Sequence, residues 1–358
     1  MSRITIKETV QNPQSGWMKG DGPEGDILIS SRVRVARNLQ EYAFPHLLQL
    51  EKAEQVIYAV GLALQDPAVI EQMGNLDVTR MSELNPVERQ ILVEKHLISP
   101  NLLEEYNKKA VALKNDEVIS IMINEEDHLR IQCLLPGLQL ERAWSLVDQI
   151  DNGLESTLNF AFDDDFGYLT ACPTNVGTGM RASVMLHLPG LALVDQVGVV
   201  LATISKLGFA VRGLYGEGTE ALGNLFQLSN QVTIGHSEEE IINSLKSVTS
   251  QVLNHEREAR KVLLQQRRDQ LENKVGRSYG ILKYAHLMSS QEAMRRLSNV
   301  RLGVDLGLIS GPSPEQLTEL MILTRQAYLI NQQSGGLNPL QLDRLRAKTI
   351  RDKFNLEG

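Results

Sequence analysis

The sequence predicts two structural regions, one of strands mixed with helices up to about residue 237 and one of helices alone after it. Over the first region, short apolar runs of strand character alternate with amphipathic patterns at helical spacing. From residue 238 onward almost no strand signal remains. We therefore expect a flexible N-terminal segment at 1–25, rich in polar residues, glycine and proline, a first domain at 26–237 and a helical C-terminal domain at 238–358.

Local patterns predict the individual elements. Strands are expected at 26–39, 116–123 and 231–235 and twice within 166–189, and helices at 50–65, 136–157 and 195–208. Ser237 and Glu240 have the spacing of a capping box, so a long helix is expected at 238–274. The stretch "GPSPEQLTELMILTRQAYLI" begins like another helix, and "LDRLRAKTIRDKF" predicts a final basic one.

Composition excludes several classes of protein. Of the 358 residues, 42% are hydrophobic and 22% charged, which is typical of a globular chain. The net charge of −8 lacks the basic signature of nucleic-acid binding, and no apolar run approaches the length that spans a membrane. Cys133 and Cys172 are too few for a disulfide framework, and the start lacks the apolar core of a signal peptide. We expect a cytoplasmic protein.

One stretch places ionisable side chains directly after an apolar strand. A strand that continued through "IMINEEDHLR", residues 121–130, would put Asn124, Glu126, His128 and Arg130 on one face. A carboxylate, an imidazole and a guanidinium at the end of a buried strand are typical of a catalytic site in α/β proteins. The alternative is a strand that ends in a solvated, charged turn.

Arginines recur on other strand-like segments. The motif "SSRVRVAR" places Arg32 and Arg34 on one strand face about 7 Å apart, where their charges repel unless an anion lies between them. In "CPTNVGTGMRASV", Arg181 follows a turn that contains Gly177 and Gly179, residues that let the backbone approach a ligand. Exposed strand edges with solvated charges are the alternative interpretation.

The residues of two further segments fit more than one role. Cys172 fits a nucleophile, a thiolate tuned by neighbouring arginines, or a small buried side chain. The loop "VRGLYGEGTEALGN" carries Arg212, Glu217 and Glu220 among glycines and fits either a closing flap or a plain hairpin connection. Taken together, arginines from separate segments with a carboxylate nearby are what phosphoryl transfer requires.

These segments resemble the signature motifs of the ATP:guanidino phosphotransferase family, which includes arginine and creatine kinases. "SSRVRVAR", "NEEDHLR", "CPTNVGTGMRASV" and "RGLYGEGTE" occur in the family's order, and the resemblance covers roughly residues 25 to 235. It implies an α+β fold in which helices flank an antiparallel sheet, rather than a doubly wound parallel sheet. The all-α C-terminal domain follows it.

The resemblance implies a role for each matching residue. The arginines expected to bind the phosphates of ATP are Arg32, Arg34, Arg130 and Arg181, with Arg212 at the start of the flexible loop. His96 and His128 match histidines near the nucleotide. Glu126 matches the carboxylate that orients the guanidinium and accepts its proton, and Glu217 and Glu220 both fall in the segment that supplies a second one. Cys172 matches a cysteine beside the substrate guanidinium, where a thiolate orients the cation. Mg²⁺ is expected on phosphate oxygens and water.

Departures from the common pattern point to one branch of the family. Tyr215 and Met185 stand where arginine and creatine kinases usually have an arginine and a histidine. About 30 residues precede Arg32, where those enzymes carry a helical domain, and more than a hundred helical residues follow the loop. This layout resembles the bacterial protein arginine kinases (McsB), whose open site accepts an arginine within a polypeptide.

The resemblance to this branch implies particular partner proteins, and two alternative functions stand beside it. The expected partners are arginine-containing protein substrates, the activator McsA and the Clp chaperone–protease. The expected setting is stress response and protein quality control, and the protein is expected to be able to form a homodimer. The rival functions are a kinase of free arginine or another small guanidino compound, and a catalytically retired phosphoarginine-binding adaptor.

The branch also has a C-terminal phosphoarginine pocket with the pattern Arg-Asp-x-x-Arg-Ala. Here Asp343 and Arg346 match it, but Leu342 replaces the first arginine. Leucine cannot pair with a phosphoryl group, so this allosteric site is expected to be weakened. The alternative is a basic amphipathic helix with no ligand.

Overall fold

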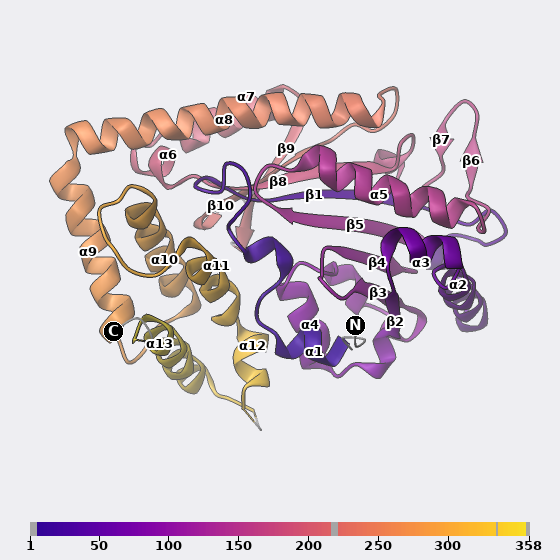
Figure 1. Ribbon diagram of the computed structural model, residues 1–358, viewed down its shortest axis with the longest axis horizontal. Coiled ribbons are helices and arrows are strands. Elements are labelled where there is room, and N and C mark those ends of the chain that lie inside the picture. The colour runs from indigo at the N-terminus through magenta and orange to yellow at the C-terminus, as the bar shows by residue number, and fades with distance from the viewer. Residues whose placement is uncertain (1–5, 216–220, 334–335, 356–358) are drawn as a thin grey trace.

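The computed structural model of the chain describes residues 6–215, 221–333 and 336–355. Its centre is an antiparallel sheet of eight strands in the order β2-β3-β4-β5-β1-β8-β10-β9. Helices cover the sheet, and further helices pack at one end (Figure 1). The expected α+β class, with an antiparallel sheet flanked by helices and a helical C-terminal region, is confirmed.

The bounds of the elements are as follows. The strands are β1 Leu28–Arg37, β2 Leu76–Arg80, β3 Ala110–Lys114, β4 Ile119–Ile123, β5 Leu129–Pro136, β6 Phe162–Asp163, β7 Gly167–Tyr168, β8 Met180–His187, β9 Phe209–Tyr215 and β10 Ala221–Asn230. The helices are α1 Ile6–Gln11, α2 Leu50–Ala63, α3 Pro67–Met73, α4 Pro86–Glu94, α5 Leu140–Glu155, α6 Pro189–Leu193, α7 Val197–Lys206, α8 Glu238–Gln266, α9 Arg268–Tyr284, α10 Ser290–Asp305, α11 Pro314–Leu323, α12 Gln326–Asn331 and α13 Pro339–Asn355. Short 3₁₀ turns include Gly16–Met18, Pro45–Leu47, Met81–Glu83, Pro100–Leu103, Tyr106–Lys108 and Pro173–Asn175.

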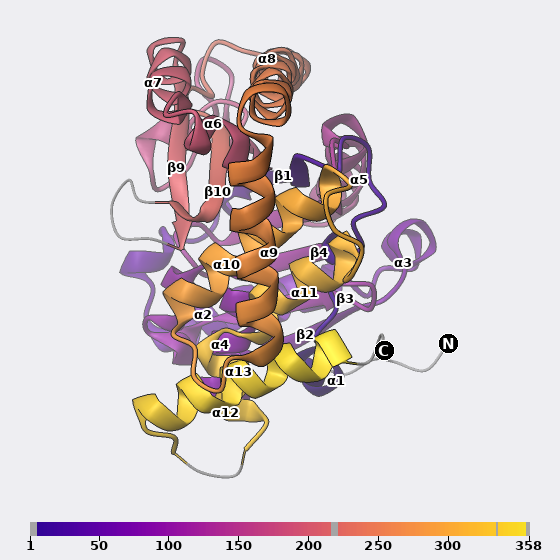
Figure 2. The same ribbon diagram turned by 90° about the vertical axis from the view of Figure 1, so that its left-hand side faces the viewer.

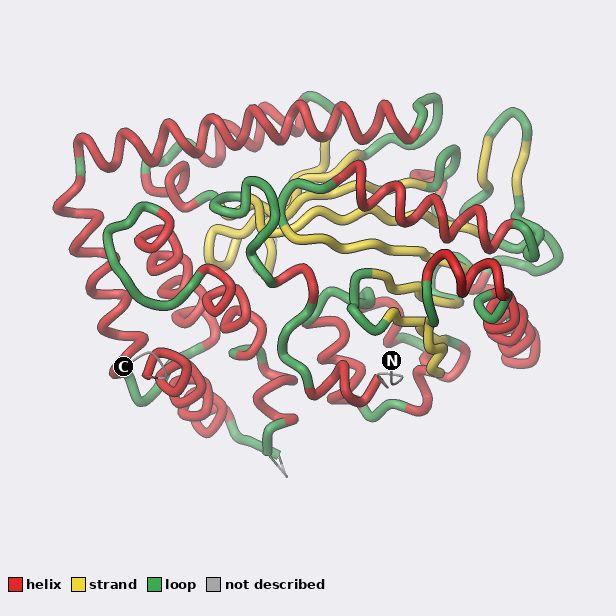
Figure 3. The backbone as a smooth tube through the Cα atoms, viewed as in Figure 1, coloured by secondary structure: helices red, strands yellow, loops and turns green. Residues whose placement is uncertain are grey.

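The two faces of the sheet differ in chemistry because successive side chains on a strand point to opposite faces. Val33 and Val35 of β1 pair with Cys133 and Ile131 of β5, and their side chains join the largest apolar core. The helices α5 and α8 lie along this apolar face, as the tube view shows (Figure 3). The opposite face carries the alternate residues of the same strands, among which are Arg32, Arg34, Gln132 and Ser183.

A break divides the long helix that the sequence predicts at 238–274. The Ser237–Glu240 capping box is confirmed at its start, where the two residues exchange side-chain-to-backbone hydrogen bonds. At Arg267 the backbone leaves helical geometry with φ −136° and ψ 30°, and α9 continues in a new direction (Figure 1). Because α8 contributes residues to the apolar core of the sheet, we propose a domain boundary at Arg267 rather than at 237.

The C-terminal helices enclose a second core. Leu297 of α10, Leu317 of α11 and Ile350 of α13 are all fully buried in it, together with Trp17 from the N-terminal segment. Figure 2 shows α9, α10, α11 and α13 in front of one end of the sheet. Within the described residues, no helix combines the length and the apolarity that a membrane crossing requires.

The N-terminal segment departs from the expected flexible surface segment. Trp17 and Met18 are 2% and 1% exposed, and the indole Nε1 of Trp17 donates a hydrogen bond to the carbonyl of Lys95 at 3.1 Å. The buried ammonium of Lys95 donates in turn to the carbonyls of Thr9 and Asn12, both at 2.9 Å. Burial of two large apolar side chains overrides the loop-like composition of this stretch.

Two expectations about strands are wrong. Residues 231–235 do not form a strand. The hydroxyl of the buried Thr233 instead donates to the Val176 carbonyl at 2.6 Å and also lies 3.0 Å from the Thr174 carbonyl. The strand after Val118 does not continue through residue 130, because β4 ends at Ile123 and Asn124 turns the chain with φ 58°. The alternative is confirmed in that a charged turn separates β4 from β5, but the turn is not solvated, because Asn124, Glu125 and Asp127 are buried in it.

Candidate active site

Arginines from three neighbouring strands meet on the polar face of the sheet. In the strand register, Arg34 of β1 lies opposite Arg181 of β8 on one side and Gln132 of β5 on the other. Arg32 lies one period along β1, opposite Ser183, and Arg130 of β5 lies opposite Ala36. All four predicted arginines therefore project from the same face, because residues two apart on a strand share a face.

Arg32 and Arg34 form the centre of this group. The Nε of Arg32 donates a hydrogen bond to the Ser183 hydroxyl at 3.3 Å. Burial, reinforced by the positive charges of Arg130 and Arg32, lowers the pKa of Arg34 well below its usual value. Positive charges held close together without a compensating anion raise the free energy of the site, and an anion with several oxygens relieves that repulsion.

Arg130 connects the arginine group to two carboxylates. Its Nη1 pairs with Oε2 of the buried Glu125, and its Nη2 lies 3.3 Å from Oε2 of Glu126. Glu125 also accepts a hydrogen bond from Ser99 at 2.7 Å. Burial alone would raise the pKa of Glu125, but Arg130, Ser99 and Arg34 together lower it, so this carboxylate is charged. Glu126 is 36% exposed and faces the open side.

Arg181 brings the Cys172 segment into the same site. Burial and the charges of Arg212 and Arg130 lower the pKa of Arg181, while Cys172 and Glu126 oppose that shift. Cys172 and Glu126 therefore both lie within electrostatic reach of Arg181. The Sγ of Cys172 is half-buried and lies 3.1 Å from the Thr174 hydroxyl, and Arg212 is exposed on β9.

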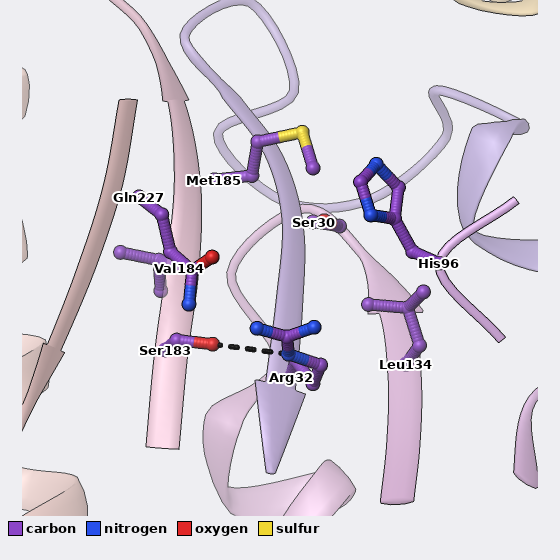
Figure 4. Close-up of a pocket in the computed structure, with 8 residues that line it drawn as sticks. All are labelled: Ser30, Arg32, His96, Leu134, Ser183, Val184, Met185 and Gln227. Carbon is purple, nitrogen blue, oxygen red and sulfur yellow. Dashed lines mark hydrogen bonds between the residues drawn. The ribbon is translucent and has the colours of Figure 1, made fainter. Parts of the chain in front are cut away.

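His96 stands across from Arg32. Figure 4 shows its ring beside a small pocket that Arg32, Met185 and Gln227 also line. Burial, followed by the charges of Arg32 and Arg325, lowers the pKa of His96 to about 3, so the imidazole is neutral at physiological pH. A neutral ring beside the arginines can accept or donate a hydrogen bond without adding to their repulsion.

A larger cavity extends from this face to the C-terminal helices. It measures about 580 Å³ and is lined by Arg32, Arg34 and His96 on one side and by Arg325 and Arg346 on the other. Arg346 is buried, where it pairs with Asp343 at 2.6 Å and donates to the carbonyls of Thr324 and Met288. Leu342 is 8% exposed on the same helix.

The structure does not bring every predicted residue into the group. His128 is fully buried, its Nδ1 accepts a hydrogen bond from the backbone of Leu39, and its Nε2 donates to the carbonyl of Ala43. Both ring nitrogens are thereby used to hold the chain after β1. Glu217 and Glu220 lie outside the described residues.

Two residues near Glu126 were not singled out from the sequence. Glu125 forms the closer pair with Arg130, and the fully buried Asp127 accepts hydrogen bonds at 2.7 Å from the Asn38 side chain and from the backbone of Ala171. Asp127 thus ties the Glu126 turn to the segment that carries Cys172. The sequence signal for Glu125 and Asp127 is their place in the acidic motif next to Glu126. The direction in which each carboxylate points depends on the turn at Asn124, which the sequence pattern does not predict.

The site suits a nucleoside triphosphate better than a resident metal. Among the described residues no three side chains of the His, Cys, Asp or Glu type gather as metal ligands. The donor set is guanidinium groups, whose planar N–H forks match phosphate oxygens.

Comparisons with known proteins agree with this chemistry. A model of the ATP:guanido phosphotransferase C-terminal catalytic domain matches residues 62–259, and a model of the protein-arginine kinase McsB C-terminal domain matches residues 268–358. The protein-arginine kinase of Desulforamulus reducens is 56% identical over 98% of this chain and 99% of its own length. That of Pelotomaculum thermopropionicum is 57% identical over 98% and 99%.

Solved structures share the fold at lower identity. The duplicated taurocyamine kinase from Schistosoma mansoni, with bound components of a transition-state analogue, has a TM-score of 0.58 and 24% identity. The match covers 72% of this chain and only 36% of that one. A lombricine kinase has a TM-score of 0.55 and 23% identity, over 67% of this chain and 68% of that chain.

Proposed function

The chain belongs to the ATP:guanido phosphotransferase family, and on this premise we propose that it is a protein arginine kinase. It transfers the γ-phosphate of ATP to the guanidinium groups of arginines in proteins. The observation that carries the proposal is the position of Arg130, which joins the arginine face of the sheet to the Glu125–Glu126 carboxylates. Phosphate binding and guanidinium binding thereby meet at one residue.

Arg32, Arg34 and Arg181 hold the phosphates of ATP in this proposal, with Arg212 at the edge. Burial lowers the pKa values of Arg34 and Arg181, and the charges of neighbouring arginines lower them further. This repulsion is relieved when a polyphosphate lies between the arginines. Mg²⁺ would be held by phosphate oxygens and water, where it neutralises charge that develops on the phosphates. Catalysis then rests largely on positioning and charge.

Glu126 orients the target guanidinium and receives its proton. A guanidine nitrogen of the substrate attacks the γ-phosphorus as the bond from that phosphorus to the β–γ bridging oxygen breaks, and ADP leaves. The nitrogen loses a proton to Glu126 in the same step, since free guanidinium has a pKa above 12 and does not lose it beforehand. Cys172 as a thiolate would orient the cation without forming a covalent bond.

Two rival functions are less well supported. A kinase of free arginine would use the same site, but the curated relatives that match this chain over 98–99% of both lengths are protein-arginine kinases. A retired phosphoarginine-binding adaptor would not need Glu126 next to Arg130, whereas the two side chains lie 3.3 Å apart.

Further parts of the proposal concern regulation and setting. We propose that the protein acts in the cytoplasm, in stress response and protein quality control, with McsA and the Clp chaperone–protease as partners, and that it forms a homodimer. The two cysteines are unpaired, in keeping with a reducing compartment. Asp343 and Arg346 remain a proposed allosteric phosphoarginine site because Arg346 lines the cavity shared with Arg32 and Arg34.

One experiment separates these functions. The protein is incubated with MgATP and either an arginine-rich protein or free arginine, and products are analysed by mass spectrometry without acid, because the P–N bond is acid-labile. Phosphorylated arginine in the protein sample, with little product from free arginine, is expected. Turnover of free arginine alone would establish the first rival, and no ATP turnover with either acceptor would favour the adaptor.

A further inference from the structure

The segment that carries Cys172 also lines an apolar groove, through Gly177 and Thr178. The groove is a cavity of about 400 Å³ between the β6–β7 hairpin and the start of α8, lined by Phe162, Phe166, Tyr168, Gly177 and Ile234 among others. Phe162, Phe166 and Ile234 are 54%, 57% and 50% exposed. Large apolar side chains exposed together, rather than singly, indicate a surface that another molecule covers.

The aromatic side of the groove is held rigidly. The Phe162 ring meets the Tyr168 ring edge-on, with 5.1 Å between centroids. The guanidinium of Arg37 lies 3.4 Å from the centroid of the Tyr168 ring and is itself bound to Asp151 at 2.6 Å. Buried charge pairs behind an aromatic ring limit its motion, so the groove exists before any partner arrives.

The hairpin tip is also preformed. The Oδ1 of Asp163 accepts hydrogen bonds from the backbone of Asp165 at 2.9 Å and of Phe166 at 3.1 Å. This turn fixes the direction of the Phe166 side chain. A partner that binds here therefore loses less ordering free energy than one that meets a mobile loop.

The groove is continuous with the substrate segment. The backbone of Tyr168 donates a hydrogen bond to the Gly177 carbonyl at 2.8 Å, and the Thr233 hydroxyl donates to the Val176 carbonyl at 2.6 Å. Gly177 has φ 108°, and a Cβ there would lie 2.7 Å from the Thr233 carbonyl, so only glycine fits. Gly177 is five positions after Cys172, and Pro173–Asn175 between them is a 3₁₀ turn. The two residues are therefore less than roughly 17 Å apart, a distance that a bound peptide would span with at most about five extended residues.

The surroundings of the groove are acidic. Asp164 and Asp165 are exposed at the hairpin tip, and Glu238 lines the opposite wall. Burial raises the pKa of Tyr168, and the charges of Asp151, Glu155 and Glu238 add to that shift against the opposing Arg37. A negative field around an apolar surface favours a partner that is both apolar and cationic.

We propose that this groove binds the substrate polypeptide within about five residues of the target arginine, selecting an apolar side chain there with cationic neighbours. The inference rests on the proposed function, since it assumes that the phosphorylated arginine belongs to a protein. The groove would help to determine which arginines of a substrate protein are phosphorylated. Polypeptide segments that expose apolar and basic side chains together are typical of unfolded chains, whose cores are open to solvent.

The test uses synthetic peptides with a single arginine in a Gly/Ser background that contains two lysines. One series carries phenylalanine five residues before the arginine, a second carries it five residues after, and a third has serine at both places. The wild type is compared with Phe162→Ser and Phe166→Ser and with the matched control Tyr284→Ser, which removes an aromatic ring that is 70% exposed on α9. Initial rates give kcat and KM for each peptide, and circular dichroism verifies that each variant is folded.

The expected result is a lower KM, by about tenfold, for one of the phenylalanine peptides over the serine peptide, with little change in kcat. Phe162→Ser and Phe166→Ser should remove most of that difference and leave the serine peptide unaffected, while Tyr284→Ser retains it. In Asp164→Asn/Asp165→Asn the KM of these lysine-containing peptides should rise. Equal KM values for all three peptides, or a difference that survives both phenylalanine variants, would overturn the inference while the kinase activity stands. If no peptide or protein is phosphorylated, the proposed function itself fails and the inference with it.

Discussion

Glu126 and Arg130 face each other across the turn between β4 and β5, with Oε2 of Glu126 3.3 Å from Nη2 of Arg130. One end of this contact belongs to the arginine face of the sheet, and the other end is the most exposed carboxylate of the acidic motif. A substrate guanidinium that binds Glu126 is therefore placed next to phosphates that bind Arg130. The geometry makes the roles of the two residues separable by mutation.

Replacement of Glu126 by glutamine is expected to suppress turnover much more than ATP binding. The amide keeps the shape of the side chain but cannot accept the guanidinium proton, and loss of such a base typically costs on the order of 10²–10⁴ in rate. Calorimetry should give an ATP affinity within a few-fold of the wild type, while the rate of protein phosphorylation falls by at least a hundredfold. A parallel loss of both quantities would contradict the assigned role.

The polar face was predictable from the sequence because it depends only on the period of a strand. Arg32 and Arg34 share a face for that reason, and the register then adds Arg181 and Arg130. The acidic motif was not predictable in the same way. The period-two argument stops at Asn124, whose positive φ begins a turn, so it misassigned the direction of His128.

Two other expectations are wrong because the local sequence pattern of these stretches does not distinguish a loop or a helix break from a continuous strand or helix. Residues 231–235 have the apolar, β-branched composition of a strand, but Thr233 uses its side chain to hold the Cys172 segment, and no strand within the described part of the chain pairs with these residues. The long helix at 238–274 shows a continuous helical pattern, but α8 packs on the core of the sheet up to Ala259, and Leu263 and Leu271 on the two sides of the break at Arg267 share a separate small core. Such long-range packing leaves no local signal.

Arg34→Ala is expected to weaken ATP binding while leaving the ligand-free protein as stable as the wild type or more so. The wild-type site holds Arg34 near Arg130 and Arg32, and its lowered pKa reflects both burial and their repulsion. Thermal unfolding followed with and without ATP is the measurement. The variant should unfold at an equal or higher temperature without ATP and lose most of the stabilisation that ATP confers. Arg80→Ala, which removes an exposed arginine paired with Glu54, is the control and should retain the ATP effect. A marked fall in the stability of the ligand-free Arg34 variant would show that Arg34 is a structural residue.

His128 is expected to make the protein less stable as the pH falls. Burial lowers its pKa to about 4, below the ordinary value near 6.5 that applies when the chain is unfolded. Between these values the unfolded chain binds the proton and the folded protein does not, so stability decreases by up to about 1.4 kcal/mol for each pH unit as pH falls through this window. Below about pH 4 both states bind the proton and the effect levels off.

The measurement compares urea unfolding of the wild type and His128→Asn between pH 7 and pH 4.5. The variant loses two hydrogen bonds and starts less stable, but its free energy of unfolding should fall less steeply with decreasing pH. His236→Asn, a change at an exposed histidine on the surface, should keep the wild-type slope. Identical slopes for all three proteins would show that His128 does not titrate with unfolding.

Asp127 is expected to position the substrate segment without contacting ATP. Its carboxylate accepts hydrogen bonds from Asn38 and from the backbone of Ala171, the residue before Cys172, both at 2.7 Å. In Asp127→Ala the segment is released, so KM for the protein substrate should rise by about tenfold or more while ATP affinity changes little. Asp116→Ala, at an exposed turn, serves as the control and should behave as the wild type.

A second readout distinguishes this positioning role from general destabilisation. Alkylation with iodoacetamide reports on Cys172, because burial raises the pKa of the Cys133 thiol to about 12 and leaves it unreactive. Release of the segment should increase the alkylation rate of Cys172 several-fold in Asp127→Ala at a temperature well below unfolding, and bound ATP should not restore the slow rate. If the rate stays at the wild-type value while KM rises, the effect of Asp127 acts through the Glu126 turn instead of the Cys172 segment. If neither quantity changes, Asp127 positions neither of them.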